Sequence, residues 1–146
     1  MCRVFFVSFC AIFMGLIINF SLSTHSYAGQ YLGEYCWTYE TDDNDVKGTI
    51  RLGVNHIGDN HYMCSGVIDV QSPIKMKFPT FGNVEFVDDK VVVTLSLNGI
   101  RDGQIGVEMI KLELDPVTFN GKTESFGAYM DANEYVEGKV TFVDCD

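Results

Sequence analysis

Positive charge is scarce in this chain, because 10 Lys and Arg residues stand against 20 Asp and Glu residues and the formal net charge at pH 7 is −10. Nucleic acids and anionic membranes bind proteins through a basic surface that displaces counterions. The composition therefore argues against both as partners. Such acidity ordinarily serves solubility, and an acidic docking surface is the alternative.

Catalytic motifs are also missing. The chain has no Gly-x-Ser-x-Gly elbow, no glycine-rich phosphate loop and no standard zinc-ligand spacing. Glu108 and Glu113 fall on opposite faces of one expected strand, so they do not form a glycosidase carboxylate pair. The sequence thus predicts no cofactor and no metal, and it gives no basis for an enzyme. If a barrel mouth were catalytic, only His56 and His61 could act as bases at neutral pH.

The longest apolar run lies at the start of the chain and predicts an export signal. Arg3 precedes an apolar segment over residues 4–20, and a short polar stretch follows. Ser26 and Ala28 are small residues at the positions that a signal peptidase recognises, so we expect residues 1–28 to be removed and one domain to span 29–146. The domain would then be periplasmic or secreted, without membrane attachment. An uncleaved anchor is the alternative.

Beyond residue 30 no segment keeps a helical period. Short stretches rich in Val, Ile, Tyr, Phe and Thr alternate with Gly, Asp and Asn clusters, a pattern typical of strands joined by tight turns. The expected strands are residues 31–40, 47–57, 61–71, 74–78, 83–87, 90–98, 104–114, 122–130 and 135–144. Short connections make consecutive strands antiparallel neighbours. We therefore predict an all-β fold, a single antiparallel up-and-down meander of about eight strands closed into a barrel, with a two-sheet sandwich as the alternative.

Strand alternation also predicts one disulfide. Removal of the signal leaves Cys36, Cys64 and Cys145. Successive side chains point to opposite faces, which puts Cys36 and Cys145 on the outer face and Cys64 on the inner face. Because closure makes the first and last strands neighbours, we expect a Cys36–Cys145 bond and a buried free Cys64. Three reduced thiols, or a pair that includes Cys64, are the alternatives.

The first strand opens with Gly33-Glu34-Tyr35-Cys36-Trp37, which places a glycine two residues before an inward aromatic. This segment resembles the start of calycin barrels, the lipocalin, fatty-acid-binding and avidin group, whose first strand opens with Gly, any residue, Trp. Here Tyr35 stands where the Trp is expected, and Trp37 follows one inward position later. The resemblance implies an up-and-down barrel whose open end holds a small apolar ligand.

Binding of a small hydrophobic or aromatic molecule in the barrel interior is therefore the first functional hypothesis. The residues expected to line its cavity are Tyr31, Tyr35, Trp37, Tyr39, Met76, Phe78, Phe86 and Leu95. Rings of this kind can equally fill a small barrel as ordinary core. The alternative hypothesis is a non-enzymatic protein-interaction or inhibitor module that acts through the acidic turns at residues 42–45 and 88–89.

One predicted hairpin gathers possible ligands for a soft metal. They are His56, Asp59, His61, Met63 and Cys64. Alternation sends Met63 and Cys64 to opposite faces, so we expect solvated turn histidines rather than a metal site.

Overall fold

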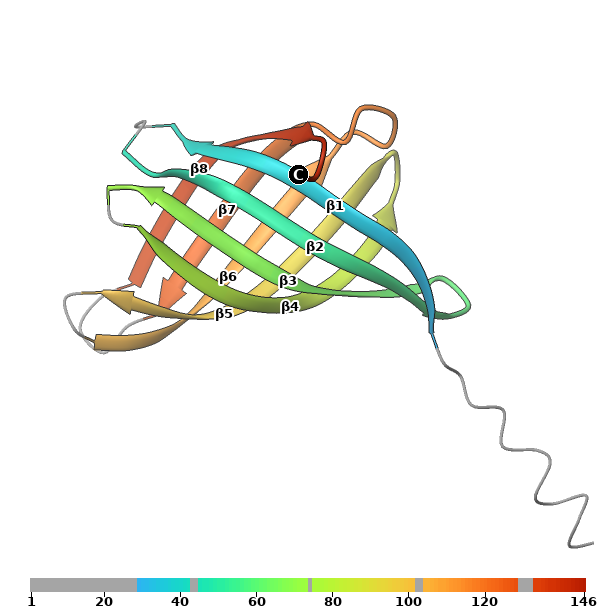
Figure 1. Ribbon diagram of the computed structural model, residues 1–146, viewed down its shortest axis with the longest axis horizontal. Coiled ribbons are helices and arrows are strands. Elements are labelled where there is room, and N and C mark those ends of the chain that lie inside the picture. Colours follow the sequence, from blue (N-terminus) through green and yellow to red (C-terminus); the bar gives the residue numbers. More distant parts are fainter. Residues whose placement is uncertain (1–28, 43–44, 74, 102–103, 129–132) are drawn as a thin grey trace, which may run out of the picture.

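The computed structural model describes residues 29–42, 45–73, 75–101, 104–128 and 133–146. These residues form eight strands: β1 Gln30–Thr41, β2 Lys47–Gly58, β3 His61–Ser72, β4 Met76–Val87, β5 Lys90–Arg101, β6 Gln104–Leu114, β7 Gly121–Ala128 and β8 Asn133–Val143. The strands pair antiparallel in chain order and β1 pairs with β8, which closes the barrel (Figure 1). The predicted closed meander is confirmed. The predicted signal segment lies outside the described residues and stays a prediction.

Strand β4 is longer than the sequence predicted. Residues 74–78 and 83–87 were expected as two strands, but one continuous strand runs from Met76 to Val87 through Pro79. A proline cannot donate to a β-ladder and is tolerated where one side of a strand lacks a partner. Pro79 lies at such a place, because β4 pairs with β3 along this stretch while its register with β5 begins only at Phe81, opposite Ser96.

The middle of the barrel is filled. Leu52, Leu95, Leu112 and Val140 come from four different strands, and each is at most 2% exposed. They belong to one hydrophobic cluster that also includes Cys64. Inward-facing positions alternate with outward ones along the strands, as the sequence predicted, except at a bulge near the start of β1. Because these four side chains are almost wholly buried, their layer separates the two ends of the interior.

A disulfide fastens the seam between the first and last strands. Cys36 and Cys145 are bonded, with their Cα atoms 5.4 Å apart, and Cys64 is a buried free thiol. Both predictions are confirmed. The register of β1 with β8 runs over six residue pairs, fewer than between any two consecutive strands. The Arg51 guanidinium also donates to the carbonyl oxygen of Asp146 and holds the C-terminal tail against β2. A disulfide of this kind is typical of proteins in an oxidising compartment.

Within the described ranges, no helix is long and apolar enough to span a membrane.

Candidate functional site

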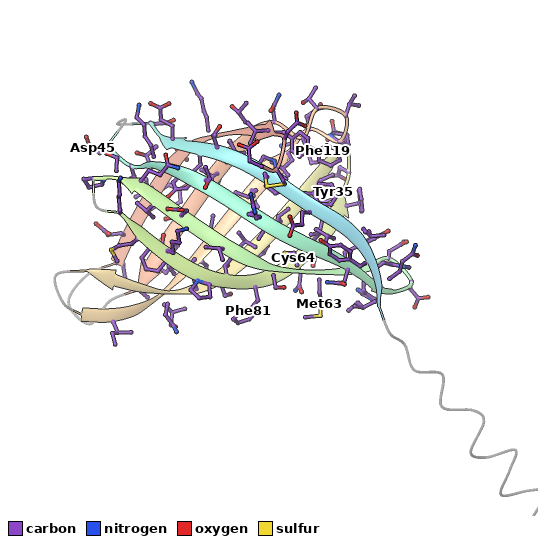
Figure 2. All side chains as sticks on the ribbon, in the orientation of Figure 1. Tyr35, Asp45, Met63, Cys64, Phe81 and Phe119 are labelled. Carbon is purple, nitrogen blue, oxygen red and sulfur yellow. A yellow bond between two sulfur atoms is a disulfide. The ribbon has the colours of Figure 1, made fainter. Side chains whose placement is uncertain are left out.

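The residues predicted to line one cavity are divided between two ends of the barrel. We call the end that carries the β2–β3, β4–β5 and β6–β7 turns the aromatic end, and the opposite one the acidic end. Tyr35, Trp37 and Phe86 line a cavity at the aromatic end, whereas Tyr39 lines a second cavity at the acidic end. Figure 2 shows Tyr35 beside the loop residue Phe119 at one end of the barrel and Asp45 at the other.

The other predicted lining residues lie elsewhere. Leu95 belongs to the filled middle layer and has no exposed surface. Phe78 is half-buried and packs against the core from β4. Met76 borders a shallow surface groove beside Asp69 and Lys77. These three residues therefore take no part in either end cavity.

Tyr31 points outward, so the prediction that it lines the interior is wrong. The register of β1 with β2 shifts between Tyr31 and Gly33, which marks a β-bulge. Gly33 has a φ of 135°, a backbone conformation that favours glycine. The extra residue reverses the alternation, and the Tyr31 ring lies over the outer face of Gly53. Leu32 turns to the rim of the aromatic-end cavity in its place.

The cavity at the aromatic end has a volume of about 100 Å³ and almost wholly apolar walls. Its lining residues are Leu32, Tyr35, Trp37, Leu52, Val54, Tyr62, Val84, Phe86, Val91, Val93, Leu114 and Phe119. A dry apolar cavity of roughly 150 Å³ accepts benzene. The aromatic-end cavity is smaller than this, so it encloses a short alkyl group or part of one ring, and the rest of the molecule extends past the rim.

Aromatic rings build the walls of this cavity. The Tyr35 and Trp37 ring centroids lie 6.3 Å apart and the rings are nearly parallel. On the opposite wall, Phe86 meets Tyr62 edge-on at 5.6 Å. Both distances fall in the range of favourable aromatic pairs. Phe86 is nevertheless 64% exposed, and Leu32 is 42% exposed, so the rim presents apolar surface to water.

A short loop between β6 and β7 covers one side of the aromatic end. The Trp37 indole Nε1 donates a hydrogen bond to the carbonyl oxygen of Phe119 at 2.8 Å, and the Phe119 ring lies 6.1 Å from that of Tyr35. Phe119 has a φ of 55°, a backbone conformation that residues other than glycine rarely adopt. The loop thus holds an aromatic side chain over the cavity and fixes the orientation of Trp37.

The carboxylate of Asp115 organises this loop. It accepts hydrogen bonds from the backbone N–H groups of Val117 and Thr118 at 3.0 and 2.7 Å, and from the Thr118 hydroxyl at 3.0 Å. These bonds lower the pKa of Asp115 below its usual value of 3.8. Asn120 completes the anchoring, since its side-chain oxygen accepts from the backbone N–H of Phe142 on β8.

The cavity at the acidic end has a volume of about 220 Å³ and combines apolar walls with carboxyl groups. Its lining residues are Tyr39, Thr41, Val46, Ile50, Ile68, Val70, Glu108, Ile110, Thr123, Ser125, Gly127, Glu134, Val136 and Glu137. Glu108 faces inward from β6, because it shares the face of Ile110 and Leu112. Its carboxylate accepts a hydrogen bond from the Ser125 hydroxyl at 3.0 Å.

Burial perturbs two titratable groups at this end. The pKa of Glu108 is raised above its usual 4.5, chiefly by burial; the hydrogen bond from Ser125 opposes this shift and the charge of Glu134 adds to it. The pKa of Tyr39 is raised to about 12 by burial and by the charges of Glu108 and Asp69. Negative charge therefore gathers around a largely apolar cavity.

Gly48 makes room for Tyr39 at the acidic end. A Cβ atom at Gly48 would lie 2.7 Å from the ring carbon Cε1 of Tyr39 and 2.2 Å from the Asp69 carbonyl oxygen. Real Cβ atoms essentially never approach so closely. Because Gly48 has no side chain, the Tyr39 ring can lie against the barrel wall at this position of β2.

The histidines of the β2–β3 hairpin line neither cavity, although the His56 ring lies 5.0 Å from that of Tyr62. His56 Nε2 lies 2.7 Å from the Asp59 carbonyl oxygen and donates to it, while the His61 side chain is exposed. Met63 points outward and Cys64 inward, as alternation predicted (Figure 2). Within the part of the chain that the structure describes, no group of three or more His, Cys, Asp or Glu residues could hold a metal ion.

The acidic turns proposed for protein interaction lie at opposite ends of the barrel. Asp88 and Asp89 are exposed at the tip of the β4–β5 hairpin, at the aromatic end. Asp42 and Asp45 are exposed at the acidic end, and residues 43–44 lie outside the described residues. Interaction through these turns stays a prediction.

Two features of the cavities escaped the sequence reasoning. Glu108 was paired only with Glu113, although the alternation of Ile110, Leu112 and Leu114 already placed it on the inner face. The role of the β6–β7 loop was also missed, because residues 115–121 were expected only as a connection between strands and Phe119 was not predicted to lie beside Tyr35 at the cavity.

No known protein family, curated protein or solved structure matches the chain.

Proposed function

We propose that this protein is a non-enzymatic binding protein that takes a small apolar molecule, or the apolar ring of a larger one, at the aromatic end of its barrel. The observation that carries the proposal is the cavity walled by Tyr35, Trp37, Tyr62 and Phe86, whose rim exposes apolar surface. Removing apolar surface from water contributes roughly 25 cal/mol per Å². A ligand that fills the cavity and covers Leu32 and Phe86 gains this contribution.

The barrel itself supports the same proposal. A closed up-and-down barrel of eight strands is the architecture that the resemblance to calycin barrels implies. Gly33 of the resembling segment supports the bulge that turns Leu32 to the cavity rim. We propose on this basis that the chain is a calycin-like barrel. The disulfide supports a periplasmic or secreted location for it.

Fluorescence of Trp37 tests the proposal, because this residue is the single tryptophan of the chain and lines the cavity. Toluene, cyclohexane and naphthalene serve as probes. We expect a saturable change in Trp37 emission and a higher melting temperature for the one-ring compounds. If neither quantity changes for any probe up to its solubility limit, the aromatic end does not bind apolar molecules.

Two phenylalanines of β4 provide a matched pair of variants. Phe86 and Phe81 are both 64% exposed, but Phe86 stands at the cavity rim and Phe81 on the outer face (Figure 2). We expect F86A to weaken binding of toluene roughly tenfold, which corresponds to ~1.4 kcal/mol, and F81A to leave it unchanged. An equal loss in both variants would show that the probe binds the outer surface instead.

A further inference from the structure

The cavity at the acidic end has no role in the proposed binding of apolar molecules. It is about twice as large as the aromatic-end cavity, at about 220 against 100 Å³. The filled middle layer of Leu52, Leu95, Leu112 and Val140 separates the two. A molecule in the larger cavity therefore meets different chemistry from one in the smaller cavity, and the two sites can be tested independently.

The charged side chains that line this cavity in the described part of the chain are all carboxylates. Glu108 lines it from β6, and Glu134 and Glu137 line it from β8. Burial raises the pKa of Tyr39, and Asp69 on β3, which pairs with Lys77, is close enough to raise it further. Among the described residues that line the cavity, none is Lys or Arg. The hydrogen bond that the structure gives the Glu108 carboxylate comes from the neutral Ser125 hydroxyl. A carboxylate has capacity for further donors.

Apolar side chains form the rest of the enclosure. Ile50, Ile68, Ile110 and Val136 come from four different strands and line the cavity around Glu108. Ca²⁺ and Mg²⁺ require several oxygen ligands around one point, and within the described residues no group of three or more His, Cys, Asp or Glu could hold a metal ion. An organic cation needs only one or two acceptors for its charged group and an apolar surface for its carbon skeleton.

We propose that the acidic end binds a small organic cation, a protonated amine with an apolar body, whose ammonium group donates to the Glu108 carboxylate and whose body packs against Ile50, Ile68 and Val136. The Tyr39 ring lies at the same wall and adds a face toward which a cation is attracted. The Glu108 carboxylate, which burial disfavours, is stabilised when a positive charge enters beside it. A cavity of about 220 Å³ is large enough for one ring with a short aminoalkyl arm.

Three probes of similar size and different charge test this proposal by isothermal titration calorimetry. Benzylamine carries a positive charge at neutral pH, benzyl alcohol is neutral and benzoate is negative. We expect benzylamine to bind with one-to-one stoichiometry and at least about tenfold more tightly than benzyl alcohol, and benzoate not to bind at this end. Equal affinities for benzylamine and benzyl alcohol would overturn the proposal.

Two variants distinguish binding of the amine in the cavity from its attraction to the acidic surface of the protein. We expect E108Q, which keeps the size and the acceptor for Ser125, to lose the preference for benzylamine over benzyl alcohol. The control E85Q removes an exposed carboxylate on the outer face of β4 and should change neither affinity. If E85Q weakens benzylamine binding as much as E108Q does, the amine is attracted only to the acidic surface and the proposal fails.

The F86A variant distinguishes this proposal from the proposed function. We expect F86A to weaken toluene binding and leave benzylamine binding unchanged, and E108Q to weaken benzylamine binding and leave toluene binding unchanged. If F86A abolishes benzylamine binding as well, the amine occupies the aromatic end and the acidic end has no ligand of this class. Loss of toluene binding alone leaves the proposal for the acidic end intact.

Discussion

The two ends of this barrel are built by the same eight strands and the same alternation, yet they differ in what they enclose. At the aromatic end Trp37, Phe119 and Phe142 pack ring against ring, with centroids 5.7 to 5.8 Å apart for the two pairs that involve Phe142. At the acidic end, β7 contributes only Thr123, Ser125 and Gly127 to the cavity. The comparison teaches that side-chain size along each strand, rather than strand number, determines how much space a small barrel leaves open.

The largest expected effect comes from the seam beside the aromatic end. Replacing both Cys36 and Cys145 by Ser removes a cross-link between residues 109 positions apart. The chain-entropy account gives a loss of roughly 5 kcal/mol in the free energy of unfolding. Urea denaturation measures it. A reducing agent should destabilise the wild-type protein and leave the double variant unchanged; equal stability of the two oxidised proteins would contradict the prediction.

The next effect concerns the layer that separates the ends. Leu95 is fully buried, so L95A should lower the free energy of unfolding by about 2 to 5 kcal/mol through lost burial and the cavity left behind. L95M keeps most of the volume and should cost less than about 1.5 kcal/mol. Urea denaturation of both variants checks this order. Similar stabilities for L95A and L95M would show that the middle of the barrel is loosely packed.

A smaller effect distinguishes the acidic end by its response to pH. Burial raises the pKa of Glu108, so its charged form destabilises the folded state at neutral pH, and this cost disappears as the pH falls below the usual value of 4.5. E108Q should therefore melt at a higher temperature than the wild-type protein at pH 7, and at the same temperature well below pH 4. A lower melting temperature for E108Q at pH 7 would mean that the carboxylate stabilises the fold.

The smallest effect is expected at the aromatic end and has the opposite sign. Hydrogen bonds to the carboxylate of Asp115 lower its pKa, so its contribution to stability is present above the usual value of 3.8 and is lost as the pH falls through the lowered pKa. D115N should melt below the wild-type protein at pH 7 and approach it in strong acid. Melting curves recorded across this range check the sign. A constant difference at every pH would contradict a role for the charge.

Much of the fold could be predicted because alternation is a strong signal in this chain. It gave the barrel and the pairing of Cys36 with Cys145 while leaving Cys64 free. It failed at Tyr31, where a bulge reverses the faces. The proline at position 79 was also misleading, since the strand continues through it along a stretch of β4 that pairs with β3 before the register with β5 begins. Both failures depend on pairing with a neighbouring strand, which a single strand's sequence does not contain.

The candidate site was harder to predict, because residues that point to the same inner face of the barrel can still line different cavities. Tyr35, Trp37 and Tyr39 all point inward, but each step of two residues advances roughly 6.6 Å along a strand. The first and the last of them therefore lie at different ends of the barrel, in different cavities. Which of them meets open space depends on partners from other strands, such as Phe119 and Gly48, that come together only in the folded protein.

The layer of Leu52, Leu95, Leu112 and Val140 also determines how molecules can exchange with the interior. Because the side chains of this layer have almost no exposed surface, the two cavities do not connect through the middle of the barrel, and each opens only at its own end. If the proposed ligands bind, each must enter and leave at its own end of the barrel. The side chains at each opening would then control the rate of release at that end, and a change at one opening would leave release at the other unaffected.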